Sequence, residues 1–595
     1  MSSLAFSRIP VRKATPQLRA LCRYPVASIP SRTSRIYSGR STIGRRWAST
    51  TSSASGVAMR SSWRRPRSIF GGGLLLLLGI GAFNTFTEPV RADSGDDEDK
   101  DDSGKTSDSL STLVRTYVVY SMCSVPALVD SAPTLLQVFS SMPLIGTIAE
   151  ALVRITFFDQ FVGGDTALET VPLLHTLRAS NKGALFAYSI EVDESEATAH
   201  SSKKKLTEPI HKRIVNEMIR CIDVAANFED EVLRGAQTGR RTWVAVKMTA
   251  LLPEAQSLIN LSKYLTDTRS PLPVPFPGCP RSTDLDVLHE HNPTRRGPLT
   301  DDDIVALREL YSDLRRICTR AQERGVKIIL DAEYSWYQPA IDAMQLALMR
   351  EFNRAPTSTD VTIPSVQPLI YGTFQAYLRR TPSQLQEAFK DARENGYSLG
   401  VKLVRGAYHP HEVAALEAKK AGKSSLSITP EDQPPVWSLK QETDQCYNEC
   451  AKTLIAAIKE DIQSKSEEQS IGVLFGTHNW TSSRLILSEL VGHGIAQEER
   501  VEGEKESVVV LGDDVTERLT MGQLYGMNDA LSNYLVRRTK SSAPMIIKYV
   551  PYGALSEVMP YLSRRAIENK SVLENGTARE ERIRAKRAIL GKLFG

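Results

Sequence analysis

The feature that most constrains the fold is a series of eight short apolar runs between residues 183 and 553. Enough sequence for a helix separates each run from the next. The runs are apolar on both faces, as parallel strands covered by helices are. Such a series predicts an α/β fold, namely a distorted (β/α)8 barrel of the TIM type, with insertions. A doubly wound sheet is the alternative, but no GxGxxG motif follows the first run. In chain order the runs are "GALFAYSIEV", "WVAVKMTAL", "VKIILDAE", "PLIYGTFQAY", "LGVKLVRGAY", "IGVLFGTHN", "ERLTMGQLYGM" and "PMIIKYVPYG".

The N-terminal part of the chain has the composition of a mitochondrial presequence, which we assign to residues 1–67. The first 87 residues contain thirteen Arg, one Lys and no acidic residue. Cationic, Ser-rich segments of this kind are typical of import signals, and an ordinary disordered basic tail is the alternative. The remaining chain holds 60 basic against 69 acidic residues, a net charge of −9. A mildly acidic body gives little support to nucleic-acid binding.

Residues 68–108 combine a short apolar segment, "IFGGGLLLLLGIGAF" (69–83), with an acidic linker. The apolar segment is shorter than the roughly 20 residues that span a bilayer. A short membrane anchor, a sorting signal and the plain end of a presequence therefore all remain open.

The rest of the chain divides into three predicted parts. Helical apolar patterns predict an N-terminal helical arm over residues 109–179, before the barrel of residues 180–570. A basic tail helix over residues 571–595 follows. The seven cysteines are scattered without a CxxC pair, which indicates reduced thiols in an intracellular or matrix compartment.

Polar residues gather where the apolar runs end. In a (β/α)8 barrel, functional side chains lie at the C-terminal ends of the strands. A single polar residue at a strand end is often structural, but six or seven strands agreeing predicts a site at this rim. The residues are Lys247, Asp331, Glu333, Gln375, Tyr377, Arg405, Tyr408, Thr477, His478, Asn479, Gln523 and Tyr549.

Two of three tyrosine-led arginine pairs are predicted to be surface features. Arg379 and Arg380 precede Thr381, a predicted helix N-cap, so they are expected in an exposed loop. Arg537 and Arg538 are expected in the last turn of a helix, where cations complement the helix dipole.

The third pair, Arg564 and Arg565, lies in the helix after the last run. Together with Tyr561 it has the spacing i, i+3, i+4, which places all three residues on one side of the helix. The planar guanidinium group suits a carboxylate and stays charged. If the helix crosses the barrel mouth, the pair faces the polar rim; an ordinary surface helix is the alternative.

Six segments together resemble the proline dehydrogenases, mitochondrial flavoenzymes also called proline oxidases. They are "ILDAE", "GTFQAY", "GVKLVRGAY", "GTHN", "GQLYGM" and "YVPYGALSEVMPYLSRRAIEN", in the family's order. The resemblance implies a distorted (β/α)8 barrel that holds FAD noncovalently, without a Rossmann domain. It also implies oxidation of L-proline to Δ1-pyrroline-5-carboxylate by a monofunctional enzyme. The electrons would pass to ubiquinone, on the matrix side of the inner mitochondrial membrane, where the enzyme would be peripheral or anchored.

The resemblance also implies roles for individual residues. Arg564 and Arg565 would bind the proline carboxylate, with Tyr561 beside them. Asp331 would pair with one of these arginines, and Lys247 would lie close by. The pyrrolidine ring would be walled by Leu403, Tyr408, Leu524 and Tyr549, and FAD would contact Gln375, Lys402, Thr477, His478 and Asn479. Glu191 is a candidate for an ion-pair gate. No metal is expected, although "HPH" (409–411) begins an insertion that superficially suggests one.

The position of Tyr549 bears on the substrate. The related hydroxyproline dehydrogenases carry a serine there, and a phenol ring is expected to crowd a hydroxyl group at C4 of proline. Three functions remain in play at this point: a proline oxidoreductase, a flavin enzyme acting on hydroxyproline or another cyclic amino acid, and a barrel that binds amino acids without turnover.

Overall fold

The computed structural model describes residues 109–124, 143–189, 209–236, 238–269, 273–289, 297–354, 367–464, 469–500, 506–571 and 577–594. The predicted presequence, the apolar segment 69–83 and Glu191 lie outside these ranges. Every described residue belongs to one compact unit, within residues 72–595. Among the described residues, no helix has both the length and the apolar character to cross a bilayer.

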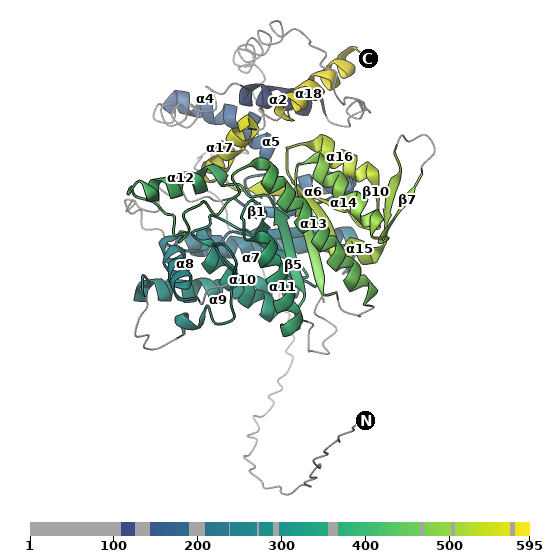
Figure 1. The fold of residues 1–595 in the computed structure, drawn as a ribbon. Helices are drawn as coiled ribbons and strands as arrows, with labels where there is room; N and C mark the ends of the chain where they lie inside the picture. Colours follow the sequence, from purple (N-terminus) through teal and green to yellow (C-terminus); the bar gives the residue numbers. More distant parts are fainter. Residues whose placement is uncertain are drawn as a thin grey trace, which may run out of the picture. The chain divides into compact units, whose positions relative to one another are not determined.

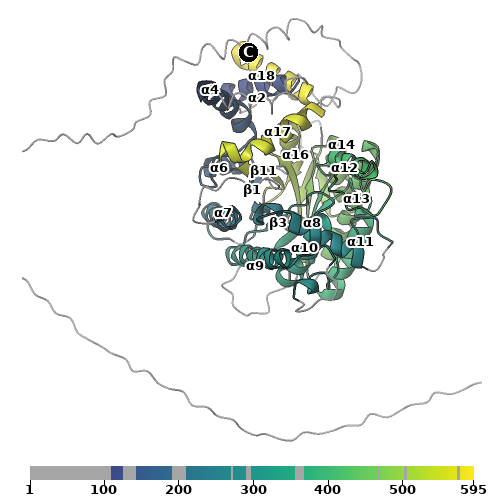
Figure 2. The same ribbon diagram turned by 90° about the vertical axis from the view of Figure 1, so that its left-hand side faces the viewer.

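The predicted barrel is confirmed. Eight parallel strands close in the order β1-β11-β9-β6-β5-β4-β3-β2, with helices on the outside (Figures 1 and 2). Each strand coincides with one of the eight apolar runs. The strands are β1 (Lys182–Tyr188), β2 (Thr242–Val246), β3 (Ile328–Leu330), β4 (Ile370–Gln375), β5 (Leu399–Val404), β6 (Ile471–Gly476), β9 (Leu519–Leu524) and β11 (Ile546–Tyr552).

Helices connect successive strands, and local signals explain where some of them start and stop. Helix α9, the last helix before β3, begins with a capping box of Thr300 and Asp303 and ends at Gly325, whose φ is +64°. The covering helices are α7 (Ile210–Leu233), η2 (Thr249–Leu251), α8 (Gln256–Thr268), η3 (Asp286–Leu288), α9 (Asp301–Arg324), α10 (Gln338–Phe352), α11 (Thr381–Asn395), α12 (His409–Lys420), α13 (Lys440–Gln463), α14 (Trp480–Gly492), α15 (Asp513–Arg518) and α16 (Asp529–Arg538).

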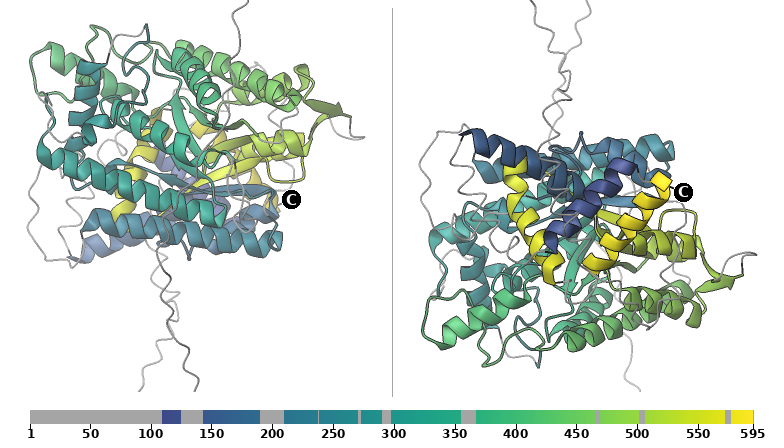
Figure 3. Two further views of the ribbon diagram at one scale, coloured as in Figure 1. Left: turned by 90° about the horizontal axis from the view of Figure 1, so that it is seen from below. Right: turned by 90° about the horizontal axis from the view of Figure 1, so that it is seen from above.

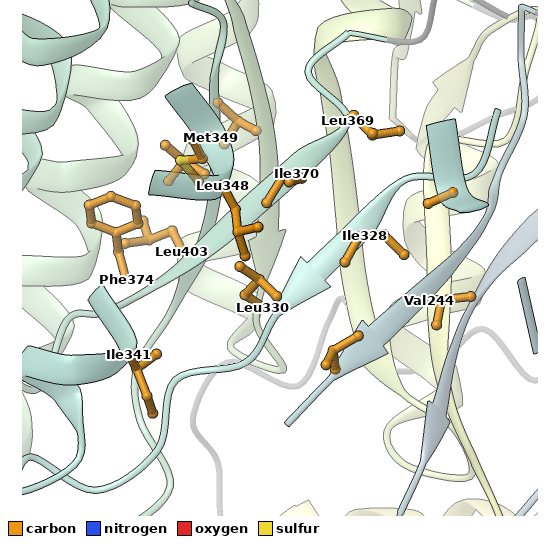
Figure 4. Packing of buried hydrophobic residues seen from close by; sticks show 14 of the residues in the cluster. Val244, Ile328, Leu330, Ile341, Leu348, Met349, Leu369, Ile370, Phe374 and Leu403 are labelled. Atoms are coloured by element: carbon orange, nitrogen blue, oxygen red, sulfur yellow. The ribbon is translucent and has the colours of Figure 1, made fainter. Parts of the chain in front are cut away.

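The strands bury one set of side chains inside the barrel and the other beneath the helices. Trp243, Ile329, Tyr371 and Ile547 belong to the interior cluster. Their neighbours in sequence pack in the outer core, of which Figure 4 shows Val244, Ile328, Ile370 and Leu403 among others. Because side chains alternate along a strand, this division determines which strand-end residues face the barrel mouth.

Helices from both ends of the described chain lie over the C-terminal ends of the strands. Helix α2 (Leu110–Cys123) packs against α17 (Leu555–Ser571) and α18 (Thr577–Phe594), and the three cross the barrel end together (Figure 3, right). An apolar cluster that includes Val119, Phe158, Val558 and Leu562 joins α17 to this N-terminal part. The remaining elements of the arm are α4 (Pro143–Val153), η1 (Arg154–Phe158), α5 (Asp159–Phe161) and α6 (Val171–Ala179).

A small three-stranded sheet beside the barrel was not predicted. It consists of β7 (Ala496–Glu499), β8 (Val508–Leu511) and β10 (Thr539–Lys540), in the order β10-β8-β7. The strands have two to four residues each, and β10 joins from far along the chain. Runs this short carry too little periodicity to be recognised in sequence.

The prediction of an exposed pair at Arg379 and Arg380 is wrong. The Arg379 side chain is only 13% exposed and pairs with Glu431 at 2.7 Å. Arg380 is buried, and its guanidinium binds the carboxylate of Asp342 at 2.6 Å and the Gly278 carbonyl at 2.6 Å. Thr381 is the first residue of α11 rather than its N-cap. The position of Arg537 and Arg538 in the last turn of α16 is confirmed.

Candidate active site

Five of the predicted site residues have the alternation that points into the barrel. Lys247, Asp331 and Tyr549 each lie two residues beyond a side chain of the barrel interior, so they are on the same side of their strands. These interior side chains are Ala245, Ile329 and Ile547, respectively. Gln375 continues the interior side of β4, and Lys402 of β5 reaches inward to Asp331. These side chains come from five different strands and meet at the end of the barrel that α17 covers.

Asp331 joins two of these residues in a buried group. Its Oδ1 accepts from Lys402 Nζ at 2.5 Å, and its Oδ2 accepts from the Tyr549 hydroxyl at 2.9 Å. The Lys402 ammonium also lies 5.2 Å from the centroid of the Tyr549 ring. The expected partner of Asp331 was an arginine of the clamp, so the structure corrects this expectation: the partner is Lys402. Asp331, held in place by this ion pair, fixes the hydroxyl end of Tyr549 at the mouth through its hydrogen bond.

The structure contradicts the expectation for Leu403. Its neighbour Lys402 points into the barrel, so Leu403 points outward, where it is fully buried in the outer core near Phe374 (Figure 4). A residue enclosed between strands and helices does not wall a substrate ring inside the mouth.

Lys247 lies beside a second buried acid, Glu333, which follows β3. Burial raises the pKa of Glu333, while the nearby positive charge of Lys247 works in the opposite direction. The carboxylate accepts from the Thr249 hydroxyl at 2.6 Å and from the Thr249 backbone N–H at 3.2 Å. The ends of β2 and β3 are thereby held together.

Helix α17 brings its arginines to two barrel strands. The Arg564 guanidinium lies 5.6 Å from the ring centroid of Tyr408, which follows β5. Arg565 is 4% exposed and lies over the Tyr561 ring, 5.1 Å from its centroid. The positive charge of Arg565 also contributes to the depressed pKa of His478, which follows β6. The pair therefore faces the barrel rather than bulk water.

Leu524 and Tyr561 belong to the packing that holds α17 in place. Tyr561 is buried in the cluster shared with α2, and Leu524 at the end of β9 packs against the same cluster. The i, i+3, i+4 side of α17 thus carries both the arginine pair and a tyrosine buried against its supports.

His478 and Gln375 each present a buried polar atom that has no hydrogen-bond partner within the described residues. The Nε2 atom of His478 accepts from the Leu524 backbone N–H at 3.1 Å, so the ring proton of the neutral imidazole is on Nδ1. That Nδ1 atom has no partner, and neither has the Oε1 atom of Gln375. The first is a donor and the second an acceptor, on the strands that flank β5.

Thr477 and Asn479 are engaged by the protein itself. The Thr477 hydroxyl accepts from Arg405 Nη1 at 2.8 Å, and Arg405 also binds Asp444 and Ser482. The Asn479 side chain accepts from the Ser482 backbone N–H at 2.9 Å and is the N-cap of α14. These contacts place the N-terminus of α14, with its partial positive charge, at the strand end.

Sequence reasoning missed the group around Tyr334. This ring stacks on Trp336 with centroids 4.4 Å apart and lies against Tyr408 at 4.2 Å. Its hydroxyl shares a 2.8 Å hydrogen bond with His411 Nδ1, and His409 Nε2 lies 2.8 Å from the Trp437 carbonyl. The "HPH" histidines are therefore engaged in structural contacts. The dense aromatic string "EYSWYQP" directly after β3 was the available signal.

The environment of His478 leads to a prediction on pH. Burial, with the charges of Lys548 and Arg565, lowers the pKa of His478 to about 3. An unfolded histidine has a pKa of about 6.5, so its contribution to stability is complete above that pH and is lost as the pH falls toward 3. The urea concentration at the denaturation midpoint of the wild type should therefore decrease as the pH is lowered from 6.5. The decrease should be smaller in His478→Asn. The surface variant His175→Asn, on α6, serves as control and should retain the full fall; an identical pH profile for both variants would contradict the prediction.

Comparison with known proteins identifies the family. The family model for proline dehydrogenase matches residues 177–577. The chain is 28% identical over 489 residues to proline dehydrogenase 2, mitochondrial, from Arabidopsis thaliana, covering 80% of this chain and 86% of that protein. It is 26% identical to hydroxyproline dehydrogenase from Mus musculus, covering 81% and 92%. Among solved structures, proline utilization A from Bdellovibrio bacteriovorus, inactivated by N-propargylglycine, aligns with a TM-score of 0.48 and 19% identity, covering 77% of this chain and 37% of that one. The chain belongs to the proline dehydrogenase family.

Proposed function

We propose that the chain oxidises L-proline to Δ1-pyrroline-5-carboxylate by FAD-dependent hydride transfer from C5 of proline to N5 of the flavin. The observation that carries the proposal is the arginine pair of α17, held over the mouth of a barrel whose sequence matches the proline dehydrogenase family. In this role Arg564 and Arg565 bind the substrate carboxylate, and the cyclic amine extends toward the strand ends.

The geometry of the mouth supports binding of a small ring acid. Two guanidinium groups favour a carboxylate through paired, charge-assisted hydrogen bonds. Tyr408 and Tyr549 supply aromatic walls, and both are half-buried. Fixing the carboxylate and enclosing the ring place one carbon reproducibly, which is the proximity contribution to catalysis.

Several residues fit an isoalloxazine ring. The flavin edge carries acceptors at N1, N5 and two carbonyl groups and one donor at N3. The donor Nδ1 of His478 and the acceptor Oε1 of Gln375 are buried and complementary to such an edge. Lys402, between them on β5, adds a positive charge, and the N-terminus of α14 suits a phosphate group. These residues and Thr477 and Asn479 would hold FAD, which supplies the hydride acceptor when bound.

The charged groups of the mouth also suit the reacting amine. The nitrogen of proline must be neutral to support hydride loss from C5. Arg564 and Arg565 place positive charge nearby, which disfavours the protonated amine. Lys402 and Asp331 form an ion pair, so their opposite charges largely cancel and leave the charge of the arginines in place.

We place the enzyme in the mitochondrion, on the matrix side of the inner membrane, with ubiquinone as electron acceptor. Relatives from Arabidopsis thaliana and Drosophila melanogaster are named mitochondrial proline dehydrogenases, and the Arg-rich segment 1–67 has the composition of an import signal. A reduced flavin needs an acceptor to turn over, and a lipid-soluble quinone is the one present in that membrane.

The direct test is an anaerobic titration of the purified protein. We expect a yellow protein whose flavin absorbance bleaches on addition of L-proline, with one Δ1-pyrroline-5-carboxylate formed per flavin reduced. A colourless protein that binds no added FAD, or a flavin that proline does not reduce, would contradict the proposal.

The phenol ring of Tyr549 is expected to make proline the preferred substrate over trans-4-hydroxyproline. Shape discrimination in a tight pocket is worth about 1–3 kcal/mol, or about 10- to 200-fold in kcat/KM. Tyr549→Ser should reduce the preference by that range. Tyr549→Phe, which keeps the ring but loses the hydrogen bond to Asp331, is the matched control and should keep the preference. Equal kcat/KM of the wild type for the two substrates would overturn this expectation.

A further inference from the structure

Two side-chain contacts hold the helix after β5 to the loop after β3: the exposed hydrogen bond between Tyr334 and His411, and the buried carboxylate of Glu412. Glu412 is 2% exposed and accepts two hydrogen bonds from Ser335, from the backbone N–H at 2.7 Å and from the hydroxyl at 2.5 Å. Within the part of the chain that the structure describes, no lysine or arginine forms an ion pair with it. Its burial is reflected in a pKa that desolvation raises to about 7.

Burying a carboxylate without a cation is costly, and the two hydrogen bonds only partly offset the cost. An apolar contact between α12 and the loop would bind the two segments at lower cost. The bidentate contact instead fixes the position of α12 relative to the loop, because two directional hydrogen bonds to one residue restrict both backbones.

The two segments so joined carry opposite parts of the proposed substrate site. Glu412 stands one turn into α12, and its backbone N–H donates to the carbonyl of Tyr408 at 3.0 Å. Ser335 follows Tyr334, whose ring packs on Tyr408, and the same loop begins at Asp331. The Tyr408 ring in turn lies 5.6 Å from the Arg564 guanidinium.

A sharp, tightly packed turn precedes Tyr408. Gly406, two residues before it, has a φ of +117°, and an added Cβ atom would lie 2.4 Å from the Tyr377 ring. A glycine is required here because only it permits this conformation and this close approach to Tyr377. Beyond the turn, the Tyr408 ring lies against Tyr334, and Tyr408 is the residue from which α12 starts, so its position depends on how α12 is held against the loop after β3.

We propose that Glu412 is a positioning residue for the reaction: through Ser335 it locks α12 against the β3–α10 loop and so sets the place of the Tyr408 ring beside Arg564. The inference rests on the proposed function, since Tyr408 matters here as a wall of the substrate ring. Glu412 itself touches neither substrate nor cofactor in this arrangement.

The test compares three substitutions in the purified holoenzyme. Glu412→Ala removes both hydrogen bonds and should raise the KM for L-proline about tenfold, with a smaller change in kcat per bound flavin, since misplacement of a positioning group by about 1 Å has effects of this order or larger. Glu412→Gln should stay within about twofold of the wild type, because its oxygen accepts from the Ser335 N–H and its amide donates to the hydroxyl. Glu417→Ala, exposed on the same helix, is the matched control and should leave KM unchanged.

Binding without turnover provides a second readout. Calorimetric titration with cyclopentanecarboxylate, a ring acid that has no C–N bond to oxidise, should give a Kd raised about tenfold in Glu412→Ala and unchanged in Glu412→Gln. A merely structural role would lower the yield and the melting temperature but leave KM and Kd of the folded fraction unchanged, and that result would overturn the proposal. An equal loss of affinity in Glu412→Gln would also overturn it, because the clamp would then depend on charge rather than on hydrogen-bond geometry.

A less disruptive variant keeps the test decisive if Glu412→Ala does not fold. Ser335→Ala removes only the hydroxyl bond and should raise KM about threefold, on the same physical grounds; an unchanged KM would contradict the clamp. Wild-type turnover of L-proline distinguishes failure of this inference from failure of the proposed function. If the wild type does not oxidise proline, the proposed function fails; if it does and the variants keep its KM, only this inference fails.

Discussion

Replacing Arg565 with methionine is expected to weaken binding of L-proline by about 2–5 kcal/mol, the range for removing one partner of a buried, hydrogen-bonded charge pair. This corresponds to an increase in KM of about 30-fold or more. The effect should be large because Arg565 is 4% exposed, so solvent neither screens its charge nor replaces it as a partner of the carboxylate. Arg564→Ala should act in the same direction. Steady-state kinetics with L-proline, normalised to bound flavin, measure both effects.

The control for this prediction comes from the chain itself. Arg537→Met changes the same residue type in a similar tyrosine-led motif, but Arg537 is exposed in the last turn of α16. It should leave KM within about twofold, since exposed charges contribute little. An unchanged KM in Arg565→Met, or an equal increase in Arg537→Met, would show that the pair of α17 does not bind the substrate.

Asp331→Asn is expected to lower both stability and activity. The change leaves the Lys402 ammonium buried without its carboxylate, and breaking such a pair costs about 3–5 kcal/mol of folding free energy. It also weakens the tether of the Tyr549 hydroxyl. Urea denaturation and kcat/KM for L-proline measure the two effects, and both should fall clearly.

Two further variants show whether the loss of stability in Asp331→Asn comes from the buried ion pair. Asp267→Asn breaks an ion pair with Lys263 in which both side chains are more than half exposed, and it should cost less than about 1 kcal/mol. The double variant Asp331→Asn with Lys402→Met should be less destabilised than the sum of its single changes, because the uncompensated charge is gone. Strict additivity would indicate that the buried pair is not coupled.

The barrel was predictable from sequence because its determinants are local. Each strand is a two-sided apolar run, and polar residues such as Asp331 and His478 mark the end at which it stops. The arginine pair of α17 was also accessible, since residues at i, i+3 and i+4 must share a helix face. Both inferences rest on periodicity within one element.

The rest depended on contacts between distant elements. Nothing near Asp331 in sequence indicates that Lys402, 71 residues later, is its partner, or that Arg380 turns inward to Asp342. The Glu412–Ser335 contact likewise joins residues 77 positions apart. Leu403 is different: strand alternation beside Lys402 determines that it points outward, so a role carried over from a family resemblance has to agree with the alternation of the strand.

In the proposed function, two guanidinium groups of α17 hold the carboxylate of a small ring acid at the mouth of a flavin-containing barrel. A crystal structure of the holoenzyme with cyclopentanecarboxylate tests it most directly. We expect the carboxylate oxygens within about 2.7–3.2 Å of the guanidinium nitrogens of Arg564 and Arg565, with the ring between Tyr408 and Tyr549. A carboxylate bound elsewhere, with neither arginine in contact, would contradict the account.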